Sequence, residues 1–420
     1  MMGPYFCGKV HVSDDPLALH EATTEPPLQR LQGARAARPW RSALLTFVML
    51  YLFIAAINMM GSGLKVAAKD EGANAQIQAA FSFADNPFVG FCVGLLVTSI
   101  VQSSSFTTSM LVMFVAHGEM TLAQAIPVIM GANMGTSITA VLVSLGHIRR
   151  RREFRLALGG AATHSWFKIL TMCVMLPLEL AFSVLSRPAT AIGNWLGHTR
   201  AFAYNPGNFN PVKTAVAPVS DLFAWLTLDV AGMSKPCAGG MIALVALLVL
   251  FGALFFLVVG LKGLLMHRIG NLFRRVLFAR PWSGFIIGIA ATALVQSSSV
   301  TTSLAVPLLA AGVLSLRQVY PYILGADIGT TVTAILASLA AAATAEDTTV
   351  ASLGLSVAAA HFLFNMFGVA LFWPLQAVPI ALGKSFARLA SARRIWALIG
   401  LAGVFFLMPI LVIALAAIMG

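Results

Sequence analysis

The chain carries one short polar stretch twice, and each copy lies inside strongly apolar sequence. The first copy is Thr98-Ser-Ile-Val-Gln-Ser-Ser-Ser-Phe-Thr-Thr-Ser109, and the second is Thr292-Ala-Leu-Val-Gln-Ser-Ser-Ser-Val-Thr-Thr-Ser303. The offset of 194 residues holds without a gap as far as Leu145 and Leu339. Polar side chains placed in hydrocarbon need partners. The fold must therefore supply partners for an amide and a row of hydroxyls in two places.

The composition predicts a helical integral membrane protein. Of the 420 residues, 59% are hydrophobic and only 10% are charged, which is more apolar side chain than a globular core needs. A net charge of +12 would suggest nucleic acid as a partner of a soluble protein. Here the cations cluster in short loops between apolar segments, so we interpret them as determinants of topology in the lipid bilayer and expect no nucleic-acid partner.

The apolar segments predict five regions along the chain. Residues 1–41 are a polar cytoplasmic tail, residues 42–177 a first transmembrane repeat, and residues 178–238 an external loop with interfacial helices. Residues 239–375 form a second transmembrane repeat, and residues 376–420 a linker and the last transmembrane helix.

Seven segments are expected to cross the membrane and two to enter it without crossing. A helix needs about 20 apolar residues to span roughly 30 Å of hydrocarbon. Residues 87–101 and 106–117 are each too short, so we interpret them as a re-entrant helical hairpin, which residues 281–312 repeat. The predicted crossings are residues 42–60, 122–145, 154–177, 241–261, 317–339, 350–374 and 395–418. Two of them contain Gly131-Ala-Asn-Met-Gly-Thr136 and Gly325-Ala-Asp-Ile-Gly-Thr330, which predict a broken transmembrane helix in each repeat.

Charge asymmetry orients this layout. Basic clusters lie near residues 30–41, 149–155, 262–280 and 384–394. If the hairpins do not cross, all four clusters fall on one side, which is the cytoplasmic side. Three crossings then separate the two hairpins, so the first dips in from outside and the second from inside. The predicted fold is an all-α integral membrane protein with two inverted-topology repeats, located in the cell (inner) membrane with a cytoplasmic N-terminus.

The hairpin tips carry the chemistry of an ion site. Inverted repeats with discontinuous helices are typical of secondary transporters. A tip presents helix N-terminal amides, which suit an anion, and C-terminal carbonyls, which suit a cation. Gln102 and Gln296 can donate to an oxyanion and accept a cation. Hydroxyls that merely hold helices together are the alternative. The duplication with Gln, in segments too short to span, favours a site.

These motifs give the chain a family resemblance. Each Gln-Ser-Ser-Ser hairpin is followed by a Gly-Ala-Asn-x-Gly-Thr-type break and then a His-x-x-Phe-Asn-type element. In this the chain resembles the sodium-phosphate cotransporters of the type II class, including their bacterial relatives. The resemblance covers residues 85–177 and 278–374.

The resemblance implies a phosphate site between the hairpin tips, with sodium as the coupling ion and no other cofactor. The implied phosphate-binding residues are Gln102, Ser103, Ser104, Ser105, Gln296, Ser297, Ser298 and Ser299. The implied sodium-binding residues are Thr107, Thr108, Asn133, Thr136, Thr301, Thr302, Asp327, Thr330 and Asn365. Sodium prefers hard oxygen ligands, which these residues supply.

Two charged residues depart from the family pattern. Asp327 stands where the first repeat has Asn133, and Lys168 stands where the second repeat has Asn365. An isolated charge within a span costs roughly 2.5 to 3.5 kcal/mol, so one of each sign is cheaper than either alone. The pair is either a structural ion pair or part of the cation sites. In the second case the Lys168 ammonium occupies or repels one cation site while Asp327 strengthens another or carries a proton, which lowers the sodium stoichiometry or shifts coupling toward protons. His164 and His361 match each other, and we expect each to be neutral and bonded to a carbonyl; a role as a ligand or proton relay is the alternative.

Our interpretation is a secondary active transporter that moves inorganic phosphate, or a close oxyanion, coupled to sodium by alternating access. A proton-coupled or exporting transporter and a channel-like or purely structural membrane protein are the alternatives. We do not expect an enzyme, because the sequence has no Gly-x-Ser-x-Gly elbow, Walker loop or HExxH, and no carboxylate pair near the serines. The oligomeric state is open, with a homodimer as one option.

Overall fold

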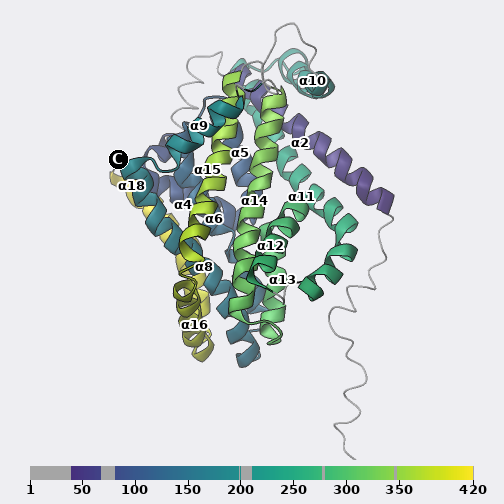
Figure 1. Ribbon diagram of the computed structural model, residues 1–420. Helices are drawn as coiled ribbons and strands as arrows, with labels where there is room; N and C mark the ends of the chain where they lie inside the picture. Colours follow the sequence, from purple (N-terminus) through teal and green to yellow (C-terminus); the bar gives the residue numbers. More distant parts are fainter. Residues whose placement is uncertain are drawn as a thin grey trace, which may run out of the picture.

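The computed structural model describes residues 39–67, 81–197, 199, 211–276, 280–344 and 348–419. All regular structure in these residues is helical (Figure 1). Nearly all of the predicted cytoplasmic tail lies outside the described residues, as does part of the predicted external loop.

Seven helical segments among the described residues are long and apolar enough to cross a membrane, as predicted. The chain is therefore an all-α, multi-pass integral membrane protein. The segments are α2 (Pro39–Ala67), α6 with α7 (Leu122–Gly135 and Ile138–Leu145), α8 (Arg151–Phe182), α11 (Lys235–Val276), α14 (Leu316–Thr344), α15 (Thr348–Phe372), and α17 with η3 and α18 (Ile395–Ala402, Gly403–Leu407 and Met408–Met419).

Four short apolar helices form the two predicted hairpins. They are α4 (Pro87–Val101) with α5 (Ser104–Ala116), and α12 (Pro281–Val295) with α13 (Ser298–Ala310). Each turn is only two residues long, Gln followed by Ser. Gln102 and Gln296 end the first arms in the left-handed region, with φ of 59° and 56°. Ser103 and Ser297 then start the second arms by accepting a hydrogen bond from a backbone N–H three residues on. The Gln-Ser pair thus ends one helix and caps the next.

Glycines bring the first arm of each hairpin against the long helix of its own repeat. A Cβ on Gly131 of α6 would lie 2.0 Å from the carbonyl oxygen of Phe91 in α4. A Cβ on Gly325 of α14 would lie equally close to the carbonyl oxygen of Phe285 in α12. Small residues at such positions let two helix backbones approach closely in lipid. The duplicated glycines therefore serve packing in both repeats.

The hairpins open at opposite ends of the helical bundle. Ala116, at the end of α5, lies beside Gly354 in the first turns of α15. Leu309, at the end of α13, lies beside Gly160 of α8 and near Leu316, the first residue of α14. Because α14 runs from Leu316 up to the α14–α15 connection, these two places are a full helix length apart (Figure 1).

The predicted helix break is present in the first repeat and absent from the second. In the first repeat the helix is interrupted at Thr136 and Ser137, between α6 and α7. In the second repeat α14 is continuous, so that part of the prediction is wrong. The hydroxyl of Ser165 in α8 donates to Ser137 Oγ (3.1 Å) at the interruption. Phe362 occupies the equivalent position in the second copy and has no hydroxyl.

The region predicted as an external loop with interfacial helices does contain helices in its described residues, and α8 extends beyond its predicted end to Phe182. After α8 come α9 (Ser186–Gly197), α10 (Pro211–Trp225) and the π-helical turn η2 (Leu226–Val230). Glu179 of α8 accepts hydrogen bonds from the backbone N–H groups that start α9. α9 then packs on α15, and Asn58 of α2 donates to Ser220 of α10 (2.9 Å). The helices of this region are therefore attached to the transmembrane bundle.

Two of the basic clusters meet at the end of the bundle where the second hairpin opens. Arg394, which follows α16 (Ala377–Ala392), donates to the carbonyl oxygen of Arg149 between α7 and α8 (3.3 Å). Arg155 and Lys384 line one cavity there, of about 440 Å³, together with Leu309 of α13. These two basic clusters therefore lie at the same end of the bundle.

Candidate functional site

The tips of the two hairpins touch each other in the middle of the bundle. Ser105 Oγ, at the start of α5, donates to the carbonyl oxygen of Gln296 at the other tip (3.3 Å). The same Oγ lies 3.2 Å from Thr333 Oγ1 of α14, and Thr333 donates to Gln296 Oε1 (2.9 Å). Residues almost two hundred positions apart in the sequence therefore form one polar centre.

Each glutamine is held by a threonine of its own repeat. Thr139 of α7 donates to Gln102 Oε1 (2.8 Å), as Thr333 does to Gln296 Oε1. The Nε2 of each glutamine donates to the carbonyl oxygen three residues earlier in its helix. In this conformation both amides are therefore bonded within the protein. Thr139 and Thr333 were missed in the sequence analysis, although both stand 37 positions after their glutamine in the duplicated block.

The threonines that follow the tips use their hydroxyl protons inside their own hairpins. The Oγ1 atoms of Thr98 and Thr107 lie 2.9 Å apart, and those of Thr292 and Thr301 lie 2.7 Å apart. Thr108 and Thr302 donate to the carbonyl oxygens of Ser104 and Ser298, respectively. A hydroxyl that donates in this way keeps oxygen lone pairs for a cation.

The second arms begin at the polar centre, so their N-termini face it. Ser104 and Ser298 are the first residues of α5 and α13, and both are buried. The first backbone N–H groups of a helix have no intrahelical acceptor, and the helix dipole makes this end positive. The α4 and α12 carbonyl ends reach the same centre. The two tips therefore combine donors that suit an anion with acceptors that suit cations.

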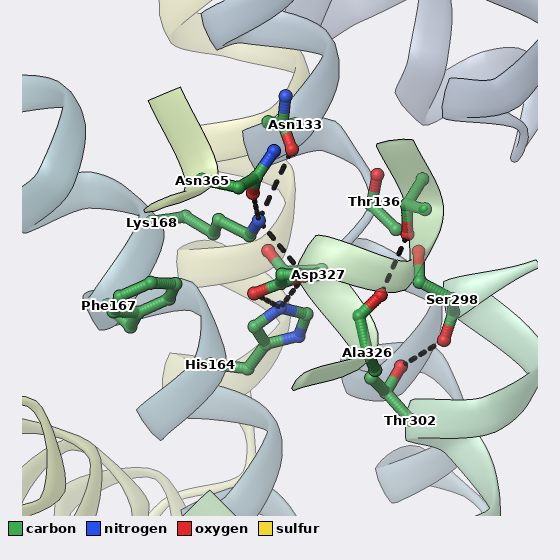
Figure 2. Close-up of polar contacts among 12 residues, drawn as sticks. Asn133, Thr136, His164, Phe167, Lys168, Ser298, Thr302, Ala326, Asp327 and Asn365 are labelled. Carbon is green, nitrogen blue, oxygen red and sulfur yellow. Dashed lines mark hydrogen bonds and ion pairs between the residues drawn. The ribbon is translucent and has the colours of Figure 1, made fainter. Parts of the chain in front are cut away.

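A second polar cluster, formed by both repeats, surrounds Lys168 (Figure 2). Lys168 Nζ lies 2.9 Å from Asp327 Oδ1. It also donates to Asn133 Oδ1 (3.3 Å) and to Asn365 Oδ1 (3.2 Å). Lys168 and Asp327 are each about 2% exposed. The two charges that depart from the family pattern therefore form a buried ion pair, flanked by the two asparagines.

The two matched histidines differ in their contacts. His164 Nε2 lies 3.1 and 3.2 Å from the two carboxylate oxygens of Asp327. Its expected carbonyl partner is thus wrong, because Asp327 offers a charged acceptor at that place. His361 is fully buried, and neither of its ring nitrogens has a hydrogen-bond partner among the described residues. The residue equivalent to Asp327 in the first repeat is Asn133, so the first repeat has no acid at that position that could contact His361 as Asp327 contacts His164.

Two further predicted residues serve their own helices. Thr136 Oγ1 donates to the carbonyl oxygen of Ala132 (3.2 Å), and Thr330 Oγ1 donates to that of Ala326 (3.0 Å). Figure 2 shows Thr136 and Ala326 beside the Lys168–Asp327 pair and the backbone of Ser298. Each of these hydroxyls therefore donates to the carbonyl oxygen four residues earlier in the same stretch of chain.

Comparisons with known proteins give one family. The Na+/Pi-cotransporter family matches residues 52–196 and 247–412. Sodium-dependent phosphate transport protein 2A of Rattus norvegicus is 31% identical over 98% of this chain and 74% of its own length. Protein 2A of Ovis aries is also 31% identical, over 98% of this chain. Sodium-dependent phosphate transport protein 2B of Homo sapiens is 28% identical over 89% of this chain, which spans 65% of that relative. No solved structure matches the chain significantly.

Proposed function

Because the chain belongs to the Na+/Pi-cotransporter family, we propose that it is a secondary active transporter of inorganic phosphate coupled to sodium ions. The observation that carries the proposal is the contact between two duplicated Gln-Ser-Ser-Ser tips inside a bundle whose described residues include seven candidate spans. Named relatives that match most of the chain transport phosphate in a sodium-dependent way, and they are transport proteins and not enzymes.

Phosphate binds between the tips in this proposal. The start of each second arm supplies backbone N–H donors, and the serines supply hydroxyls. Ser104, Ser105, Ser298 and Ser299 are buried, whereas Gln102 is half-buried. Removing a strongly hydrated anion from water requires many such donors and a nearby cation. Both glutamine amides would have to exchange a bond to the protein for one to phosphate.

Sodium binds at oxygens that do not face phosphate. Thr107, Thr108, Thr301 and Thr302 donate their protons to other groups of their hairpins and keep lone pairs for a cation. The carbonyl ends of α4 and α12 add backbone oxygens at the same tips. Anion and cation would then neutralise each other in a water-poor centre, which couples their binding.

Alternating access follows from hairpins that open at opposite ends of the bundle. We place the protein in the cell membrane with the N-terminus and the Arg149–Arg394 end in the cytoplasm, because cytoplasmic loops are enriched in Arg and Lys. The first hairpin then opens outward and the second inward. A tip-to-tip centre that is uncovered from one side at a time is the expected transport cycle.

Reconstituted protein tests the function. Uptake of radiolabelled phosphate into proteoliposomes should saturate and should require an inward sodium gradient. Replacement of sodium by choline should abolish it at two pH values. Uptake that follows a proton gradient in choline would favour the proton-coupled alternative, and flux that neither saturates nor needs a gradient would favour a pore.

Cysteine labelling tests the orientation. Thr121 and Ser315 are equivalent, exposed residues at the open ends of the first and second hairpins. In a background without the four native cysteines, Thr121→Cys should react with a membrane-impermeant thiol reagent from outside, and Ser315→Cys from inside. Labelling of both from one side would contradict the inverted topology.

A further inference from the structure

Lys168 holds its ammonium group in a cage of three oxygens that come from three other helices. Asn133 of α6, Asp327 of α14 and Asn365 of α15 each direct an Oδ1 atom at Nζ, at 3.3, 2.9 and 3.2 Å. We infer that these three oxygens form a cation-binding site, that Lys168 fills it with a tethered cation, and that the site takes a sodium ion when the lysine is removed.

The asparagine oxygens are oriented without help from Lys168. Asn133 Nδ2 donates to the carbonyl oxygen of Ile129 (3.1 Å), and Asn365 Nδ2 donates to that of His361 (3.0 Å). Each amide nitrogen is thus bonded to the carbonyl four residues earlier in its helix. With the nitrogen bonded to its own helix, the oxygen of each amide is the atom that faces Nζ (Figure 2).

The carboxylate is also held independently of the lysine. His164 Nε2 contacts both oxygens of Asp327, and an imidazole that donates there fixes the carboxylate. His164 and Lys168 are both on α8, one helical turn apart. Removal of the lysine ammonium therefore leaves an oriented set of one carboxylate and two amide oxygens.

The internal repeat has a neutral residue at the position equivalent to the lysine. The position equivalent to Lys168 in the second copy is Asn365, and the position equivalent to Asp327 in the first copy is Asn133. The two pairs of equivalent positions thus hold two asparagines, Asp327 and Lys168. The side-chain oxygens of the asparagines and of Asp327 all contact the Lys168 ammonium. Hard oxygens without a competing donor are the ligands that small metal cations select. A lysine ammonium satisfies the same oxygens but cannot leave them.

The consequence for transport rests on the proposed function. An acid paired with a sodium ion needs one ion from solution in every cycle. An acid paired with Lys168 needs none. The protein should therefore move fewer sodium ions per phosphate than it does when Lys168 is replaced by a neutral residue, with one additional sodium ion expected in the variant.

Sodium binding tests the site without transport. Purified wild type, Lys168→Asn, Lys168→Gln and Lys168→Arg are melted in phosphate-free buffer with choline chloride or sodium chloride. Sodium should raise the thermal unfolding midpoint of Lys168→Asn and Lys168→Gln by several degrees more than it raises that of the wild type. Lys168→Arg, which keeps a cation in the cage, should behave as the wild type does. In Lys168→Asn/Asp327→Asn the additional sodium effect should disappear, because the carboxylate is gone.

The recovery of the variants is itself informative. Lys168→Gln keeps an amide donor within reach of Asp327 and covers the case in which Lys168→Asn does not fold. Recovery of either variant only when sodium is present during extraction supports the inference. Failure of both with sodium present, while Lys168→Arg is recovered, overturns it, and so does an equal effect of sodium on wild type and neutral variants.

The flux ratio connects the site to coupling. Uptake of labelled sodium and labelled phosphate is compared in the same proteoliposomes, with wild type and Lys168→Gln. A higher ratio of sodium to phosphate in the variant is expected, and an unchanged ratio refutes the role in coupling. If the wild type takes up no phosphate, the proposed function fails, whereas the melting experiment still decides whether the cage binds sodium.

Discussion

The buried ion pair makes a quantitative prediction about stability. At the 2.9 Å between Lys168 Nζ and Asp327 Oδ1, Coulomb attraction amounts to about 6 kcal/mol at an effective dielectric constant of about 20. Transfer of the two charges out of water costs several kcal/mol for each ion, so the intact pair adds little net stability. Removal of one partner leaves the other with its desolvation cost and without the attraction.

Single and double substitutions should therefore differ sharply. Lys168→Asn or Asp327→Asn should each lower the free energy of unfolding by about 3 kcal/mol, at the lower end of the roughly 3 to 5 kcal/mol for broken buried pairs. The lower end is expected because His164 still contacts Asp327 in the first variant, and Asn133 and Asn365 still accept from Lys168 in the second. The double variant should unfold close to the wild type.

The assay is unfolding in detergent, followed by far-ultraviolet circular dichroism, in choline buffer so that sodium cannot replace the lysine. Arg150 and Glu153 give a matched control, because they also lie 2.9 Å apart but Arg150 is largely exposed. Neutralisation of either should change the midpoint little, since exposed pairs are weak. A double variant destabilised by the sum of the two single effects would refute the reasoning, because independent sites add.

Three further outcomes are expected. Gln102→Ala and Gln296→Ala should each abolish sodium-coupled phosphate uptake in folded protein, since a lost bond to a charged ligand costs about 1.5 to 3 kcal/mol; near-normal uptake by both would remove the tips from the site. Gly131→Ala should destabilise by about 1 to 3 kcal/mol, because its Cβ would meet the Phe91 carbonyl oxygen at 2.0 Å. Gly252→Ala in α11, where a Cβ meets nothing within 4 Å, is the control and should not destabilise the protein. Equal unfolding midpoints for Gly131→Ala and Gly252→Ala would argue against the close packing of α4 on α6. Phosphate with sodium, at about 100 times the dissociation constant, should stabilise the protein by about 2.7 kcal/mol, whereas phosphate with choline should stabilise it less.

The hairpins and spans could be predicted because the length of an apolar segment, and its repetition in the chain, can be read from the sequence without knowing what the segment packs against. A segment of 15 residues such as Pro87–Val101 cannot cross the bilayer, whatever it packs against. The continuity of the long helix in the second repeat, where a break was expected, could not be predicted in this way. Gly325 has the same sequence signature whether a helix unwinds or approaches a neighbour closely, and in α14 it does the second.

The charged cluster shows what a sequence pattern leaves open. Lys168 and Asp327 could each be recognised as costly charges within spans, but their contact depends on how α8 packs against α14. The same holds for His164, whose partner is a side chain of the other repeat. Thr139 and Thr333 were overlooked for a different reason. Ser and Thr commonly form hydrogen bonds between membrane helices, and no neighbouring residue distinguishes these two threonines from such structural ones.

The glycine contacts also decide which parts can move relative to each other. Gly131 contacts the carbonyl group of Phe91, and Gly325 contacts the carbonyl group of Phe285. At both places two helix backbones touch, and no side chain lies between them that could change rotamer. Each first arm should therefore travel with its long helix as one solid piece. The second arms are different, because α5 packs on α14 and α15 of the other repeat, and α13 on α7 and α8. In the proposed transport cycle, sliding would occur along these contacts. The bond between Ser105 and the carbonyl oxygen of Gln296 joins the two repeats there and would have to break for the tips to separate.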